Sequence, residues 1–132
     1  MNKEARAEWV KDLRSNQYRQ GFGRLKSHDG SYCCLGVACE TYKRLTGRGE
    51  WRKNDEHDDS FSVDNPSPDR IIDYDYLSLP LTVAQYFGFD DQNPTLLQGD
   101  KVTPTNCVSI NDALRANFHV IADLIERTYL KD

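Results

Sequence analysis

The chain has 132 residues, of which 38% are hydrophobic and 29% are charged, and its formal net charge is −4. Two Trp, seven Tyr and five Phe supply enough large apolar side chains for a core, which excludes a wholly disordered chain. The longest apolar run is only a few residues, far below the ~20 that cross a bilayer, which excludes a membrane-embedded protein. The start MNKEARAEW lacks the apolar stretch of a secretory signal, so we expect a cytoplasmic protein.

The first third of the chain predicts a helix followed by a hairpin. Apolar residues recur at steps of three and four over residues 3–16, which indicates an amphipathic helix. The run His28-Asp29-Gly30-Ser31 is typical of a tight turn, because Asp-Gly readily adopts positive φ. Two short strands are therefore predicted, over residues 23–27 and 31–33.

A second helix and a long loop follow. Helical spacing of apolar residues predicts a helix that begins at Cys34 or Leu35 and ends near Thr46, with Gly47 as its C-cap. Residues 47–69 are polar, rich in Asp and interrupted by Pro, which favours a long, mobile acidic loop.

The second half of the chain predicts shorter elements. Apolar and acidic residues alternate over residues 71–77, as in a half-buried strand. Pro80 suits the first turn of a short helix and Gly88 its C-cap, and a strand is predicted over residues 95–98.

A closing helix completes the predicted fold. Asn111 or Asp112 is expected to cap it, and its apolar stripe is Phe118, Ile121, Ala122, Ile125 and Tyr129. Together the elements predict a single compact α+β domain over residues 1–132, with about four helices packed on a small antiparallel sheet and a long acidic loop.

Charge is unevenly distributed along the chain. Residues 1–53 carry twelve Lys or Arg against six Asp or Glu, a net charge of +6. Residues 54–112 carry two basic against twelve acidic residues, a net charge of −10. Either the two segments fold together and neutralise each other, or they present separate charged faces to an anionic ligand or a cationic partner.

The basic segment interleaves arginine and lysine with aromatic residues. Arginine pairs with phosphate in a bidentate geometry and aromatic rings stack on bases, so this segment is a candidate site for a small anionic nucleotide. No phosphate-binding glycine loop accompanies it. The candidate ligand-binding residues are Arg14, Tyr18, Arg19, Phe22, Arg24, Lys26 and Tyr32.

The acidic segment is a candidate surface for a basic partner protein, because complementary charge steers association and partner choice. Its spacing does not match a calcium-binding loop, so no metal site and no cofactor are predicted. The candidate partner-binding residues are Asp55, Glu56, Asp58, Asp59, Asp73 and Asp75.

Four cysteines (Cys33, Cys34, Cys39 and Cys107) are expected to be free thiols, since their spacing matches neither a disulfide framework nor a zinc site. Cys34 at a helix start superficially resembles the nucleophile of papain-type cysteine hydrolases. Catalysis also needs a nearby His, and His28, His57 and His119 are all placed differently from the His of those enzymes. No catalytic residue is therefore predicted, and a cysteine-dependent hydrolase stays an alternative.

Several strings occur in a fixed order: W-x3-LRS, YCCLGVxC, LP, IND and F-x2-IADLIE. In this order they resemble a family of small uncharacterised proteins encoded by tailed bacteriophages. The resemblance covers both ends of the chain, whereas the acidic middle departs from it. It implies a phage setting and no particular chemistry.

By analogy with small phage accessory proteins, the leading hypothesis is a binding protein that counters a host function by binding a host protein in the host cytoplasm. The first alternative is capture of a nucleotide-type signalling molecule. A homodimer is compatible with the sequence, although no residue argues for it.

Overall fold

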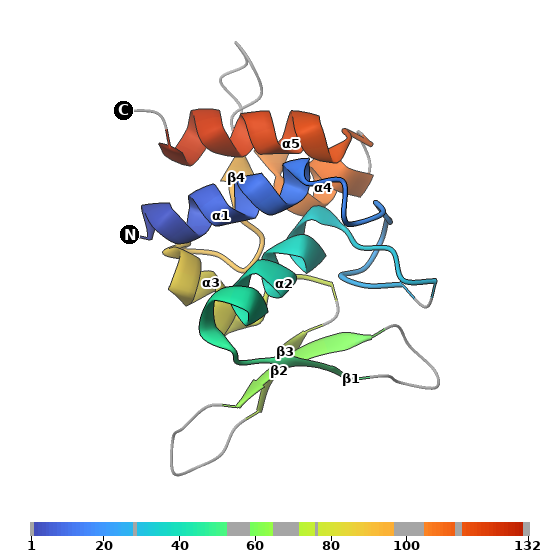
Figure 1. Cartoon of the computed structure of the whole chain (residues 1–132), viewed down its shortest axis with the longest axis vertical. Helices are drawn as coiled ribbons and strands as arrows, with labels where there is room; N and C mark the ends of the chain where they lie inside the picture. The colour runs from blue at the N-terminus through green and yellow to red at the C-terminus, as the bar shows by residue number, and fades with distance from the viewer. Residues whose placement is uncertain are drawn as a thin grey trace.

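Two helices close in sequence, α1 (Lys3–Arg14) and α2 (Cys34–Thr46), pack side by side at the centre of the molecule (Figure 1). The computed structural model describes residues 2–27, 29–52, 59–64, 72–75, 77–96, 105–112 and 115–130. Both helices lie where the apolar periodicity predicts them, and Gly47 ends α2 with a φ of 71°.

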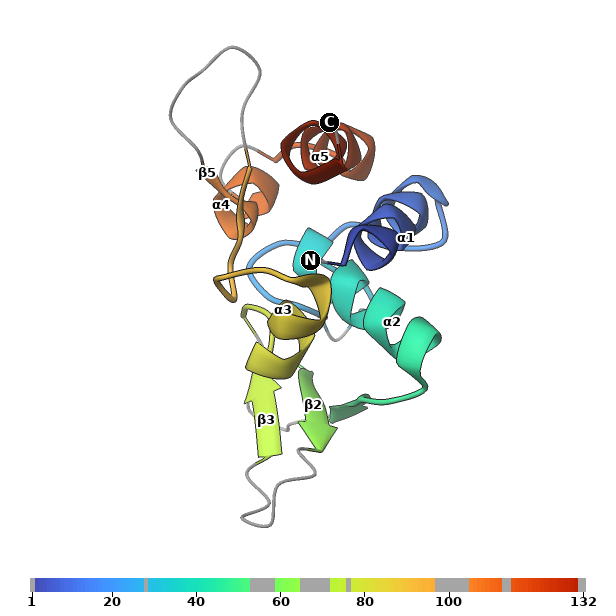
Figure 2. The same ribbon diagram turned by 90° about the vertical axis from the view of Figure 1, so that its left-hand side faces the viewer.

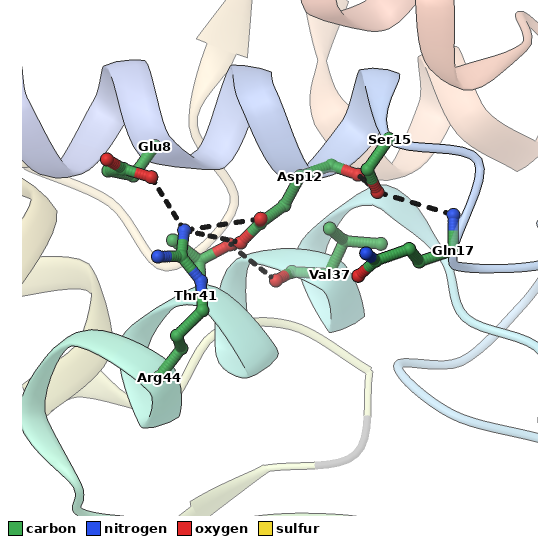
Figure 3. A network of polar contacts seen from close by, with 7 residues as sticks. All are labelled: Glu8, Asp12, Ser15, Gln17, Val37, Thr41 and Arg44. Atoms are coloured by element: carbon green, nitrogen blue, oxygen red, sulfur yellow. Dashed lines mark hydrogen bonds and ion pairs between the residues drawn. The ribbon is translucent and has the colours of Figure 1, made fainter.

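A polar network fixes α1 to α2 (Figure 3). Nη2 of Arg44 donates to Glu8 at 2.7 Å and to both carboxylate oxygens of Asp12 at 3.1 and 3.2 Å. The hydroxyl of Thr41 lies 2.7 Å from the same Asp12 carboxylate. Because Asp12 is buried, these partners compensate for the loss of its hydration. At the end of α1 the Ser15 hydroxyl donates to the Asp12 carbonyl, which fixes the exit of the chain from the helix.

Helix α5 (Phe118–Ile125) continues into a short π-helix, η1 (Glu126–Leu130), and both pack on α1. The face of α5 turned to the core is apolar, with Ile121 and Ile125 fully buried, as its predicted stripe requires. In Figure 1, α1 therefore lies between α5 and α2.

A three-stranded antiparallel sheet lies at the opposite end of the molecule from α5 (Figure 2). Its strands, in the order β1-β2-β3, are Glu50–Arg52, Ser60–Asp64 and Ile72–Asp75. Trp51 pairs with Phe61, and Phe61 pairs in turn with Asp75. The strand predicted over residues 71–77 is confirmed in its central part.

The predicted acidic loop over residues 47–69 is wrong in part, because β1 and β2 both lie in it. Trp51, Phe61 and Val63 supply the apolar side chains for these strands, and Phe61 and Val63 are fully buried. The polar composition of the whole segment concealed these few residues. Residues 53–58 and 65–69 lie outside the described residues.

The rest of the second half is made of short elements. Helix α3 (Leu81–Phe87) ends at Gly88 as predicted, with Pro80 as its N-cap. Strand β4 (Thr95–Leu96) pairs antiparallel with β5 (Thr105–Asn106), and α4 (Cys107–Asp112) follows directly.

The predicted cap of the closing helix is wrong. Asn111 and Asp112 end α4, and α5 begins six residues later at Phe118. The N-cap of α5 is Asn117, whose side chain accepts from the Val120 N–H at 2.9 Å. Both asparagines precede apolar residues with helical spacing, and only tertiary contacts of Asn111 distinguish the two positions.

The predicted hairpin is reduced to its turn. The Ser27 N–H donates to the Ser31 carbonyl at 2.9 Å, and the Gly30 N–H donates to the Ser27 carbonyl at 3.0 Å. Next to this turn, Lys26 pairs with Tyr32 in an isolated antiparallel bridge. The second strand cannot extend because Cys33 is the N-cap of α2. With five α-helices and small antiparallel sheets among the described residues, the protein is a single compact α+β domain, as predicted.

Candidate binding surface

The connection between α1 and α2, residues 15–33, carries most of the predicted ligand-binding residues (Figure 1). Its two ends are joined by backbone hydrogen bonds, from Gly21 N–H to the Tyr32 carbonyl at 2.6 Å and from Tyr32 N–H to the Arg19 carbonyl at 2.8 Å. We call the exposed and half-buried side chains of residues 15–33 the loop face, together with Trp51, which contacts Tyr32, and Arg115, which contacts Phe22.

Close packing on α2 holds this connection in place. The carbonyl oxygen of Leu25 approaches Gly36 so closely that a Cβ there would lie 1.9 Å from it. The absence of a side chain at Gly36 therefore permits the close approach of this connection to α2.

A buried amide, Asn111, connects the loop face to α4. Its Oδ1 accepts from Cys34 N–H at 3.2 Å and from Gln20 Nε2 at 2.9 Å. Its Nδ2 donates to the Gly21 carbonyl at 2.9 Å and to Asp112 at 2.7 Å. The local sequence predicts a helix cap at Asn111 and not this role, because the main partners of its side chain are 77 to 91 residues away.

One part of the loop face is a cluster of aromatic rings. Tyr32 packs edge-to-face on Tyr18 and Trp51, with ring centroids 5.3 and 5.9 Å apart. The Glu40 carboxylate accepts from the Tyr32 hydroxyl at 3.0 Å and from Trp51 Nε1 at 2.8 Å. Burial and the Glu40 charge raise the pKa of Tyr32 well above its usual range. The ammonium of Lys26 lies 5.5 and 5.4 Å from the Tyr32 and Trp51 centroids, so the cluster already holds a cation.

Lys26 also links the basic and acidic segments, since its Nζ lies 3.9 Å from the Asp59 carboxylate. At this point the two segments neutralise each other, which was one of the two interpretations that the sequence left open. Asp59 is buried, so it is not a free surface charge for a partner.

The other predicted partner-binding residues do not form a described acidic surface. Asp75 accepts from the N–H groups of Leu77 and Ser78 at 3.0 and 3.3 Å and so closes the turn after β3. Asp73 lies on β3 opposite Val63. The residues Asp55, Glu56 and Asp58 lie outside the described part of the chain.

The three arginines predicted to bind a ligand do not all lie on the loop face. Arg14 turns away from the loop face and pairs with Asp123 at 2.5 Å and Glu126 at 2.9 Å, and these carboxylates raise its pKa. Arg19 stays on the loop face and pairs with Asp29 at 3.2 Å, with both side chains about two-thirds exposed. Arg24 is exposed on the same face.

A second part of the loop face is the pair of Phe22, which the sequence predicts as a ligand-binding residue, and Arg115, which it does not. The guanidinium carbon of Arg115 lies 4.5 Å from the ring centroid of Phe22, which is 37% exposed. Arg115 is exposed and has a φ of 51°, an uncommon value for a residue other than glycine. Within the described residues it forms no ion pair. It was missed because it is 93 residues from Phe22 in the sequence.

The cysteines offer no activated nucleophile. All four are free and buried, and the Cys34 sulfur lies 3.6 Å from the Cys107 carbonyl oxygen. The contact with Cys107 and burial raise the pKa of Cys34, and burial raises the pKa values of Cys33 and Cys39. His119 contacts Asn16 at 3.1 Å, while His28 and His57 lie outside the described residues.

Elsewhere, a shallow depression of about 520 Å³ lies between α1 and η1, with Val10, Lys11, Arg14, Glu126 and Leu130 among its lining residues. Ser15 is the residue of the loop face that lines it. Across the described ranges, no group of three or more His, Cys, Asp or Glu side chains could hold a metal ion. In the same part of the chain no helix has the length and apolar character needed to cross a bilayer.

A family model described as a domain of unknown function, DUF8296, matches residues 1–129, and the chain therefore belongs to this family. No curated protein and no solved structure matches the chain.

Proposed function

We propose that this member of the DUF8296 family is a binding protein without catalytic activity, and that it binds another protein through the loop face. The observation that carries the proposal is the exposed Arg115, which forms no ion pair within the described part of the chain and lies over the exposed ring of Phe22. Residues of this kind, aromatic rings and arginine, are the ones in which protein interfaces concentrate their binding energy.

The loop face is also preorganised. Asn111 and Gln20 fix the backbone beneath it, because Gln20 Nε2 donates to the Ala116 carbonyl at 2.7 Å as well as to Asn111. Ala116 follows Arg115, so the same contact holds the arginine beside Phe22. A surface that is already ordered loses less conformational entropy on association.

The acidic segment is a weaker choice for the partner surface. Asp59 pairs with Lys26 and Asp75 closes a turn, so both carboxylates have roles inside the fold. Combined with the resemblance to phage proteins, which remains a prediction, the proposal is that a phage protein binds a host protein in the host cytoplasm and counters its function.

Site-specific photo-crosslinking tests this function. The photoreactive residue p-benzoyl-phenylalanine is placed at position 22 in one variant and, as a control, at Leu81 in another. Leu81 is 52% exposed and lies on α3, away from the loop face. In living bacteria we expect a defined partner to crosslink from position 22 and not from position 81. Equal crosslinking from both positions, or none from position 22, would contradict the proposal.

Nucleotide capture is the second candidate, supported by the lysine beside the Tyr32 and Trp51 rings. A thermal-shift series with cyclic nucleotides and ADP-ribose derivatives tests it. The candidate requires a rise in Tm that Arg24→Ala abolishes. No rise with any of these compounds removes the candidate.

A further inference from the structure

We infer that the partner presents to the loop face an acidic segment in which an apolar side chain lies next to a carboxylate, with Arg115 binding the carboxylate and Phe22 the apolar group. This inference rests on the proposed function and adds the chemistry of the partner.

The charge of the loop face favours an anionic group. Residues 15–33 contain Arg19, Arg24 and Lys26 against Asp29, and Arg115 adds one positive charge; with Asp59, the partner of Lys26, counted as well, the net charge is +2. Asp29 is already engaged, since it accepts from the Ser31 N–H and hydroxyl at 3.0 and 2.7 Å. Opposite potentials across an interface raise the rate of association and select the partner.

Arg115 is the arginine best placed to bind this group. Arg14 and Arg44 are each held by two carboxylates, whereas Arg115 is paired with none among the described residues. Phe22 lies against one face of the planar guanidinium, and no carboxylate of the described residues pairs with its N–H edges. These edges match the two oxygens of a carboxylate in a bidentate pair.

Phe22 supplies the apolar part of the site. Its ring is 37% exposed although it is large and apolar, and Arg115 orients it. A partner that buries this ring gains roughly 25 cal/mol for each Å² of apolar surface removed from water. A carboxylate alone would leave this ring in contact with water, so the carboxylate and an apolar side chain should be neighbours in the partner.

The same observations favour a protein over a nucleic acid. Nucleic-acid binding depends on many phosphate contacts along an extended basic surface. Here the whole chain has a net charge of −4, and Lys26 on the loop face is already paired with Asp59. A compact site for one or two carboxylates fits this charge distribution better.

Fluorescence anisotropy with the full chain tests the inference. The probes are a labelled ten-residue peptide of Glu with two Phe, a Glu-only peptide of the same length, and a ten-nucleotide single-stranded DNA. We expect the mixed peptide to bind most tightly. Arg115→Gln should weaken its binding about tenfold or more, in keeping with the strength of charge-assisted hydrogen bonds. Arg115→Lys should restore only part of the affinity, because lysine lacks the planar fork.

Arg127→Gln is the matched control, since Arg127 is exposed on η1, away from the loop face. It should bind the mixed peptide like the wild type, and circular dichroism checks that every variant is folded. The inference is overturned if Arg115→Gln and Arg127→Gln bind equally, if the DNA binds more tightly than the mixed peptide, or if no probe binds. Equal binding of the two peptides overturns the role of Phe22.

The two proposals fail in different ways. A partner that crosslinks from position 22 while Arg115→Gln leaves peptide binding unchanged would retain the proposed function and reject the acidic partner. Absence of both the crosslink from position 22 and the peptide binding would reject the loop face as a binding surface.

Discussion

Nε of Arg6 donates a 2.8 Å hydrogen bond to the carbonyl oxygen of Phe87, 81 residues away in the sequence. Nη2 of the same arginine donates to the Gly88 carbonyl at 2.8 Å, so the guanidinium binds the C-terminal end of α3. The Phe89 and Tyr129 rings lie 4.7 and 4.4 Å from its central carbon. Burial lowers the pKa of Arg6, and the helix dipole and the rings offset the cost of burying its charge.

Arg6→Lys should therefore destabilise the protein by about 2 kcal/mol. A lysine loses the two-pronged contact with α3, and hydrogen bonds to charged groups contribute roughly 1.5–3 kcal/mol each. Urea unfolding measures the change. Arg127→Lys, at an exposed position, is the control and should change stability by less than about 0.5 kcal/mol. A loss as small as that of the control would show that the contact with α3 contributes little.

Asn111→Ala should lower the free energy of unfolding more than Asn117→Ala does. The first leaves Cys34 N–H and the Gly21 carbonyl without partners in a buried site, at about 1–3 kcal/mol for each group. The second removes an exposed helix cap, at about 1 kcal/mol. Thermal unfolding of the two variants compares them, and a larger loss for Asn117→Ala would contradict the role assigned to Asn111.

Buried thiols should make stability depend on pH in the alkaline range. The pKa values of Cys33 and Cys39 are raised by burial above the ordinary value of 9.0, so the folded state holds protons that the unfolded chain releases. This contribution is fully present below about pH 9, and it is lost as the pH rises further. Urea unfolding at pH 8, 9 and 10 under reducing conditions should show the decline.

Cys39→Ala is the control for this dependence, because it removes one titrating group and should reduce the decline. The same burial predicts that a thiol reagent labels the protein only as fast as it unfolds. Rapid labelling of Cys34 in the folded state would revive the cysteine-hydrolase alternative.

Arg115→Gly should stabilise the protein while it weakens peptide binding. Glycine adopts a φ of 51° without the strain that a side chain causes, so we expect a gain of about 0.5–1 kcal/mol. Arg127 lies in the helix η1, so Arg127→Gly should instead lower the free energy of unfolding by about 1 kcal/mol. Urea unfolding of the pair measures both, and a loss for Arg115→Gly would indicate that its stacking on Phe22 outweighs the strain.

Gly36→Ala should destabilise the protein by about 1–3 kcal/mol or more, because the added Cβ cannot fit against the Leu25 carbonyl without moving the backbone of the loop face. Thermal unfolding measures the loss. Ala38→Gly, in the same helix and also buried, controls for the general cost of changing a small residue there. An unchanged Tm in Gly36→Ala would show that residues 15–33 are not held against α2.

Local patterns were sufficient for α1, α2 and α3. Their apolar periodicity, and the glycines at positions 47 and 88, act within a few residues of each helix. The same reasoning missed β1 and β2, since a strand with one or two buried residues is hard to detect in a polar segment. It also misplaced the start of α5, because Asn111 and Asn117 are equivalent as local capping signals.

The sequence by itself determined the fold class, the central helices and the residue types of the candidate surface, because periodicity and turn chemistry are local properties. Only the tertiary structure decided which charges remain available. Arg14 and Asp59 acquired partners from other elements, and Arg115 came to lie over Phe22. Contacts between residues tens of positions apart depend on how the helices pack, and no short-range pattern encodes them.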